Sequence, residues 1–226
     1  MPTTARPATR DAGMEGWVAR WYARTRAADM ADFRSEAARV AARLPAGSAV
    51  LEVAPGPGYF AIELARHGGF AITGLDISRS FVAMATDNAV KAGVRIAFRL
   101  GNAAAMPLPD DSFDLVYCSA AFKNFAEPIK ALDEMHRVLR PGGEALIVDL
   151  RKDVPLAEID AYVRRSGRTK LDAWITRQAF RRMLIGRAYT AEAFERMAAA
   201  SRFGSGAIRT EAIGIELALR KQQAAN

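Results

Sequence analysis

The stretch VLEVAPGPGYF, residues 50–60, joins a short apolar run, an acidic residue, a turn with two glycines and the start of a helical pattern. Glycine is needed where the backbone turns sharply and comes close to a ligand, because a Cβ would block the approach. Gly56 and Gly58 meet that need. Taken alone, the turn also fits the dinucleotide pattern G-x-G-x-x-G/A. The stretch therefore predicts a strand followed by a nucleotide-binding turn.

Short apolar runs alternate with helical patterns around this turn, which is typical of parallel strands joined by crossover helices. The expected strands are residues 49–53, 71–75, 95–100, 115–118 and 145–148, and the helices between them are residues 59–67, 80–92 and 129–139. Pro141 and Gly142 close the last of these helices. A helix from Thr190 and a hairpin of strands 207–212 and 213–219 follow. The pattern predicts an α/β fold.

A second acidic residue stands at the end of the next expected strand. Asp76 follows the glycines by about twenty residues, where a carboxylate can accept hydrogen bonds from both hydroxyls of a ribose. The alternative is a solvated aspartate that caps the following helix. A polar residue, Asn102, then comes after the third expected strand, within GNAAAMPLPDDSFDLVYCS, residues 101–119. Together these features favour a nucleotide-containing ligand.

A further motif is EMHRVLRPGGEALIVDL, residues 134–150, with a PGG turn before the fifth expected strand. In this order, the motifs of residues 50–150 resemble the class I S-adenosylmethionine-dependent methyltransferases of the small-molecule type. The resemblance implies a Rossmann-like fold with a central, mostly parallel seven-stranded sheet, an antiparallel C-terminal strand and helices on both faces. It also implies S-adenosylmethionine as the methyl donor and S-adenosylhomocysteine as the product.

The same resemblance implies roles for single residues. Glu52 would reach the methionine end of the donor, Asp76 the ribose and Ile77 the adenine. The cofactor-binding residues that we expect are Tyr22, Glu52, Ala54, Gly56, Gly58, Asp76, Ile77, Asn102, Ala103 and Ser119.

Two positions depart from the family's usual pattern. Ala54 and Pro55 stand where Gly and a small residue are common, and alanine fits there if its φ stays below zero. Asn102 stands where Asp is frequent, and its amide can both accept a hydrogen bond from the adenine amino group and donate one.

The acceptor side is predicted from aromatic and polar residues outside the repeated pattern. The stretch AAFKNFAEPIKALDEM, residues 120–135, resembles the region after the fourth strand in quinone-biosynthesis C-methyltransferases. Lys123 and Asn124 are there either a substrate-facing pair or a solvated lysine beside a helix-capping asparagine. Aromatic rings on the helices around this region either contact the acceptor or pack those helices onto the domain. The substrate-binding residues that we expect are Trp17, Trp21, Phe122, Lys123, Asn124, Trp174 and Tyr189.

The domain organisation follows from these patterns. Residues 1–13, with two prolines and few apolar residues, are expected to be a disordered lead-in. The resemblance implies that residues 14–226 form one methyltransferase domain, in which we expect residues 14–46 to be lid helices that include Tyr22 and residues 152–188 to be a helical insert over the substrate site.

The expected reaction is methyl transfer to oxygen, nitrogen or carbon of a small aromatic or hydrophobic metabolite. The sulfonium leaving group departs neutral, so alignment does most of the work and no catalytic residue is assigned. One cysteine and two histidines cannot build a standard zinc site. The alternatives left open are an RNA methyltransferase that uses the basic segment 151–187, a donor-binding protein without methyl transfer and, more distantly, an NAD-dependent oxidoreductase.

The charge and apolar composition indicate which kinds of partner to expect. The formal net charge is +7, but the arginines of residues 151–187 are not interleaved with exposed aromatic platforms, so nucleic acid is not the expected partner. No stretch approaches the roughly 20 apolar residues of a membrane span, and we expect a cytoplasmic protein. Frequent Ala and Arg are typical of a GC-rich bacterial genome. A homodimer is left open.

Overall fold

Seven strands and the helices between them make up most of the chain that the computed structural model describes, residues 13–165 and 186–223. The strands are β1 (Ala49–Val53), β2 (Ala71–Asp76), β3 (Ala97–Leu100), β4 (Phe113–Ser119), β5 (Leu139–Leu150), β6 (Ala207–Thr210) and β7 (Gly214–Arg220). The helices are α1 (Gly16–Arg26), α2 (Met30–Ala41), α3 (Tyr59–Arg66), α4 (Arg79–Lys91), α5 (Pro128–Val138), α6 (Leu156–Arg165) and α8 (Ala191–Ala200), with 3-10 turns η1 (Ala27–Asp29) and η2 (Phe122–Asn124).

The strands form one sheet in the order β3-β2-β1-β4-β5-β7-β6. The first five strands of this order, β3, β2, β1, β4 and β5, run parallel to one another, and β7 runs antiparallel to both β5 and β6. The expected sheet and its C-terminal hairpin are therefore confirmed. β1 has β2 on one side and β4 on the other, so the strand order reverses there. In open α/β sheets, ligands bind at the carboxyl ends of the strands beside such a reversal.

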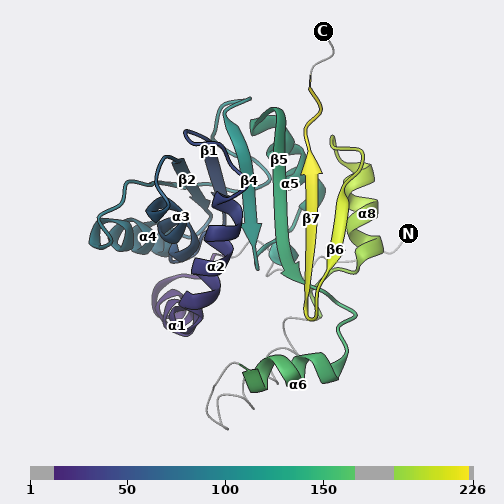
Figure 1. Cartoon of the computed structure of the whole chain (residues 1–226), viewed down its shortest axis with the longest axis horizontal. Helices are drawn as coiled ribbons and strands as arrows, with labels where there is room; N and C mark the ends of the chain where they lie inside the picture. The colour runs from purple at the N-terminus through teal and green to yellow at the C-terminus, as the bar shows by residue number, and fades with distance from the viewer. Residues whose placement is uncertain (1–12, 166–185, 224–226) are drawn as a thin grey trace.

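Alternate residues of each strand face two separate cores. Val50, Leu115 and Tyr117 pack with the apolar residues of α2 and α3 on one face. Leu51 and Val116 face the other side, where α5 and α8 cover the sheet. Figure 1 shows α2 crossing in front of the sheet and α5 behind it. Helices on both faces bury a sheet whose strands are apolar on both sides, as parallel sheets require.

Helix starts follow ordinary capping chemistry. The Ser78 hydroxyl accepts from the Phe81 N–H (3.1 Å) at the start of α4, and Thr190 accepts from the Ala193 N–H (3.3 Å) at the start of α8, as expected for Thr190. Pro128 occupies the first turn of α5, where its missing N–H costs nothing.

The fifth strand differs from the expectation. β5 begins at Leu139, so the PGG turn lies inside the strand and not before it. Leu139 pairs with Phe113 and Glu144 with Leu115, and the register shifts between these two pairs. The shift takes up the residues of the turn, with Gly142 at φ +84°, which is why the glycine pattern looked like a helix end. β3 also starts later than predicted, at Ala97.

The division into a lead-in, lid helices and a helical insert stays a prediction. The lead-in, residues 1–12, and Trp174 lie outside the described residues. Gly13, counted in the lead-in, belongs to the fold, because a Cβ there would lie 3.1 Å from the Ser78 Cα. Within the segment 152–188 the structure describes α6, which lies beyond the carboxyl ends of β4 and β5 (Figure 1).

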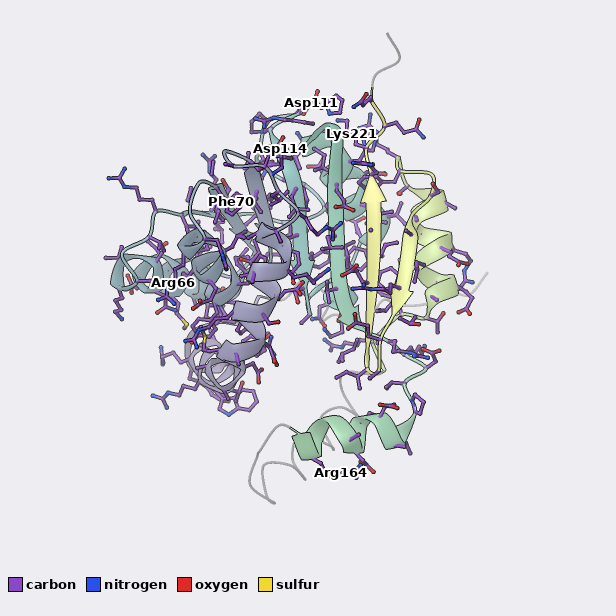
Figure 2. The ribbon with its side chains drawn as sticks, in the orientation of Figure 1. Arg66, Phe70, Asp111, Asp114, Arg164 and Lys221 are labelled. Carbon is purple, nitrogen blue, oxygen red and sulfur yellow. The ribbon has the colours of Figure 1, made fainter. Side chains whose placement is uncertain are left out.

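At the end of the sheet away from α6, Lys221 connects β7 to the loop before β4 and to β5. The Lys221 ammonium lies 2.6 Å from Asp111 and donates to the Leu139 carbonyl at 2.7 Å, and Figure 2 shows Lys221 and Asp111 at the end of the sheet away from Arg164. No helix within the described ranges combines the length and apolar character needed to cross a membrane.

Candidate functional site

A cavity of about 250 Å³ lies at the carboxyl ends of β1 and β4. Its floor comes from the sheet and from the loop after β1, and its far wall comes from α1, α2 and the start of α3. The lining residues are Glu52, Ala54, Pro55, Gly56, Pro57, Tyr117, Ser119, Ala120 and Val148 on the sheet side, and Tyr22, Arg26, Asp32, Phe33, Glu36, Tyr59 and Phe60 on the helix side. The position is the one at which the strand order reverses.

The glycine loop bends through three left-handed residues. Gly56 (φ +54°) and Gly58 (φ +79°) adopt a conformation that glycine takes without strain. A Cβ on Gly58 would lie 3.0 Å from both the Ala85 Cβ and the Phe98 Cζ, so this glycine also permits close packing. The condition under which alanine was expected to fit at position 54, a φ below zero, is not met, because the φ of Ala54 is +57°. Its N–H donates to the Leu75 carbonyl (2.7 Å), which holds the turn in place.

Glu52 is the buried carboxylate of the cavity. Its side chain is 5% exposed, and its Oε2 has no hydrogen-bond partner. Burial raises the pKa of Glu52 to about 8. A buried carboxylate oxygen without a partner is unfavourable unless a ligand donates to it. The cavity therefore carries an unused acceptor suited to a cationic or hydrogen-bond-donating group.

Asp76 lies at the end of β2 and is held by backbone amides. Its Oδ2 accepts from the Gly56 N–H (3.0 Å) and its Oδ1 from the Ser78 N–H (2.9 Å). Burial raises the pKa of Asp76 to about 6. The alternative of a solvated capping aspartate is wrong, because Asp76 is buried and Ser78 caps α4. Asp76 couples the glycine loop to β2.

The residues predicted to lie around the adenine do not line the 250 Å³ cavity. Ile77 is 38% exposed beyond the end of β2. The Asn102 Oδ1 accepts from the Ala104 N–H (2.8 Å), so it is used within its own loop, where Ala103 is half-buried. Of the ten predicted donor residues, the cavity brings together Tyr22, Glu52, Ala54, Gly56 and Ser119, and leaves Gly58, Asp76, Ile77, Asn102 and Ala103 outside its lining.

A contact that the sequence analysis missed ties the N-terminal segment to α4. The Glu15 carboxylate accepts from the Arg79 and Ser80 N–H groups, both at 3.0 Å. The Ser78 hydroxyl donates to the Met14 carbonyl (2.6 Å). No local pattern signals this contact, because the partners are more than sixty residues apart. The start of α1 is thereby fixed beside the carboxyl end of β2.

Most predicted acceptor residues lie elsewhere. Trp17 and Trp21 are 72% and 59% exposed and do not line the cavity. Phe122 is fully buried and packs on Phe194, with ring centroids 5.7 Å apart, so no ligand reaches it. Tyr189 packs on the same two rings. An aromatic ring after a strand forms core here because α8 covers that face of the sheet.

Both interpretations of Lys123 are wrong. Its ammonium is buried and lies 2.7 Å from the Asp149 Oδ1, facing neither a substrate nor solvent. It also donates to the Ala120 carbonyl, and Ala120 lines the cavity at φ +55°. Asn124 accepts from Arg187 at 3.4 Å and does not cap α5, which begins at Pro128. Lys123 is therefore a buried support for the loop after β4.

The helix side of the cavity carries a polar chain that the sequence analysis did not single out. The Tyr117 hydroxyl donates to the Glu36 Oε1 (2.9 Å), and Arg39 binds Glu36 through both carboxylate oxygens. Phe60 stacks on Tyr117 with ring centroids 4.0 Å apart. Burial raises the pKa of Tyr117 well above its usual range. These partners lie on different elements, so only the fold brings them together.

The described residues hold no group of three or more His, Cys, Asp or Glu side chains placed to bind a metal ion. Cys118 is fully buried, and burial raises the pKa of its thiol, which disfavours the nucleophilic thiolate.

Known proteins match this region. Residues 51–147 fit the family described as "Methyltransferase domain". The chain is 40% identical over 117 residues to a demethylmenaquinone methyltransferase of Deinococcus radiodurans, covering 51% of this chain and 48% of that protein. It is 36% identical over 115 residues to a 27-O-demethylrifamycin SV methyltransferase of Amycolatopsis mediterranei, covering 49% and 42%. The chain spans about half the length of the curated relatives that it matches.

A solved structure extends the match to the whole fold. A Methanococcus maripaludis protein assigned as an S-adenosyl-L-methionine-dependent methyltransferase superposes with a TM-score of 0.73 at 19% identity, covering 100% of this chain and 99% of that one. Residues 51–147 therefore match a methyltransferase domain, the chain shares the fold of that solved structure, and S-adenosylmethionine is the cofactor that the matched family implies. The resemblance seen in the sequence is confirmed.

Proposed function

We propose that this protein transfers a methyl group from S-adenosylmethionine to oxygen, nitrogen or carbon of a small aromatic or hydrophobic metabolite. The observation that carries the proposal is the Glu52 carboxylate, buried in the cavity with one oxygen unpartnered. The methionine end of the donor carries an ammonium group. That cation would donate to Glu52 and favour its ionised form, which removes the cost of the unpaired oxygen.

The glycine loop supports the same placement. Gly56 lines the cavity, and a Cβ there would meet only the Tyr22 ring, at 3.8 Å. A ligand can therefore lie directly against the backbone at this point. Asp76 accepts from the Gly56 and Ser78 N–H groups and so holds Gly56 in place, and in the proposal its carboxylate would also accept from the ribose hydroxyls. The roles of Glu52, Gly56 and Asp76 in donor binding are part of the proposal.

The helix side of the cavity supports the proposed acceptor class. Phe33, Tyr59 and Phe60 line that side, and Tyr22 completes an aromatic wall. Aromatic walls favour flat or hydrophobic ligands over strongly hydrated ones. The polar groups among them, Asp32 and Glu36, would orient such an acceptor.

The chemistry needs alignment more than acid–base help. A lone pair or carbanion of the acceptor forms a bond to the methyl carbon while the carbon–sulfur bond breaks, and its electron pair stays on sulfur. Bound S-adenosylmethionine would supply the methyl group and would leave as the neutral thioether S-adenosylhomocysteine, and the acceptor's proton would pass to water. Holding nucleophile, methyl and sulfur in line supplies most of the acceleration.

The experiment that tests the proposal has two stages. Calorimetric titration with S-adenosylhomocysteine, with NAD as the comparison, tests donor binding. Incubation with S-adenosylmethionine and a panel of phenols, quinols and amines, followed by mass spectrometry, tests transfer. Methylated product together with S-adenosylhomocysteine is expected. Binding without product from any acceptor class would favour the donor-binding alternative and contradict methyl transfer.

A cytoplasmic location and a homodimer stay predictions from the sequence. The RNA alternative rests on residues 151–187, of which residues 166–185 lie outside the described part of the chain.

A further inference from the structure

The exposed face of α1 carries two tryptophans that the cavity does not use. Trp17 and Trp21 are 72% and 59% exposed, although indole rings are usually buried. Arg20 and Arg24 are also exposed on this helix. The four residues follow the spacing i, i+3, i+4, i+7, which places them on one face of a helix. Here they are called the α1 stripe.

The rest of α1 faces the protein. Ala19 and Ala23 are buried at 0% and 6% exposure on the side opposite the α1 stripe. Tyr22 and Arg26 line the cavity. The α1 stripe is therefore the outer side of a helix whose inner side is a cavity wall, and Figure 1 shows α1 at the end of the sheet toward which β4 and β5 point.

We propose that the α1 stripe docks the protein on an anionic membrane surface. Tryptophan favours the interface between lipid headgroups and acyl chains, where the ring is in an apolar environment and the N–H remains hydrated. Arginines beside it bind lipid phosphates while their stems lie along the apolar surface. α1 contains three arginines and no acidic residue, so its charge complements an anionic leaflet.

Charge disfavours a second copy of this chain as the occupant. Pairing two α1 stripes would bring four guanidinium groups together. The nearest acidic side chain in sequence, Glu15, is engaged by the first turn of α4 and not by the arginines. Met14, 36% exposed just before α1, extends the apolar surface with an aliphatic group, which suits lipid better than stacked bases.

The inference rests on the proposed function only for the biological reason to dock, which is access to an acceptor in the membrane. An acceptor dissolved in the bilayer would meet the cavity through the helix that touches both. Docking itself is independent of catalysis, because the α1 stripe contributes no residue to the cavity lining.

Flotation of the full-length chain with lipid vesicles tests the proposal. Binding is expected to vesicles of phosphatidylcholine with phosphatidylglycerol, to be weaker with phosphatidylcholine alone, and to weaken as salt rises. The Arg20→Gln/Arg24→Gln variant should bind about 30-fold more weakly, since each basic residue near the surface contributes roughly fivefold. The Trp17→Ala/Trp21→Ala variant should lose at least about tenfold.

The matched control removes one apolar and one basic side chain from an exposed part of α4. Val90→Ala/Lys91→Gln should bind vesicles like the wild-type chain. Titration with S-adenosylhomocysteine shows separately whether each variant is folded and binds the donor. Unchanged vesicle binding in both α1 stripe variants would overturn the inference. The inference would also be overturned if the wild-type chain did not bind anionic vesicles. Binding to single-stranded RNA, or self-association through Trp17 and Trp21, would then identify the partner of the α1 stripe.

Discussion

The Lys123 ammonium and the Asp149 carboxylate form an ion pair of 2.7 Å in which both side chains are buried, at 3% and 1% exposure. Asp149 also accepts from the backbone N–H groups of Lys123 and Leu150. The pair joins the turn after β4 to the end of β5, next to the cavity residue Ala120. The Asp149 carboxylate is shielded from water, so the Lys123 ammonium is needed to compensate for the loss of hydration of its negative charge.

Lys123→Met should therefore destabilise the fold by about 3–5 kcal/mol, since it leaves Asp149 buried without its counter-charge. The matched control is Lys130→Met, which removes the exposed ion pair of Lys130 with Glu127 and should change stability by about 0–1 kcal/mol. Urea unfolding followed by circular dichroism measures both. Similar losses in the two variants would mean that the buried pair has no special structural weight.

Two glycines with nearly equal φ allow the cost of backbone strain to be measured separately from the cost of a steric clash. Gly58 and Gly68 have φ of +79° and +76°, but a Cβ on Gly58 would lie 3.0 Å from Ala85 and Phe98, whereas one on Gly68 meets nothing within 4 Å. Gly68→Ala should cost about 1–2 kcal/mol of unfolding free energy from the left-handed backbone alone. Gly58→Ala should cost more and also weaken S-adenosylhomocysteine binding. Equal losses by thermal or urea unfolding would refute the packing argument.

Ala54 predicts a stabilising substitution. Its φ of +57° strains an alanine but not a glycine, so Ala54→Gly should raise the free energy of unfolding by up to about 1 kcal/mol. Ala83→Gly, at an exposed position within α4, should lower it by about 1 kcal/mol, because glycine weakens helices. The same unfolding assay on both variants checks that the signs are opposite.

Glu52 predicts a dependence of stability on pH. Its pKa is raised from 4.5 to about 8 in the folded chain, so the folded state holds this proton more tightly than the unfolded state. The stabilising contribution is complete below pH 4.5 and is lost as the pH rises toward 8, by up to about 1.4 kcal/mol per pH unit. Glu52→Gln should therefore become progressively more stable than the wild-type chain across this range. Parallel pH profiles of unfolding for the two chains would argue against a raised pKa.

Short apolar runs between helical patterns made most of the fold predictable. β1 and β4 are apolar on both sides, because Val50 and Leu115 face one core whereas Leu51 and Val116 face the other. The loop after β1 was predictable for a local reason, since Gly56 and Gly58 mark left-handed backbone. The start of β5 was predicted wrongly because Pro141 and Gly142 are equally typical of a helix end and of a shift in strand register, and the sequence does not distinguish the two.

The acceptor side was less predictable because its contacts are between distant elements. Phe122 is core only because α8 returns to cover it, and Lys123 is buried only because Asp149 lies on the neighbouring strand. Trp17 and Trp21 were expected to contact the acceptor or to pack their helix onto the domain, but both are exposed. The sequence did not indicate that Ala19 and Ala23 are the residues of α1 that face the protein.

In the proposed function, Glu52 holds the cationic end of the methyl donor. Calorimetric titration of S-adenosylhomocysteine into the wild-type chain, Glu52→Gln and the exposed control Glu195→Gln measures this contribution. One site per chain is expected in the wild-type and control proteins, with affinity about 10- to 100-fold weaker in Glu52→Gln, because a charged hydrogen bond contributes roughly 1.5–3 kcal/mol. Equal affinity in all three chains, or no binding to the wild-type chain, would contradict the account.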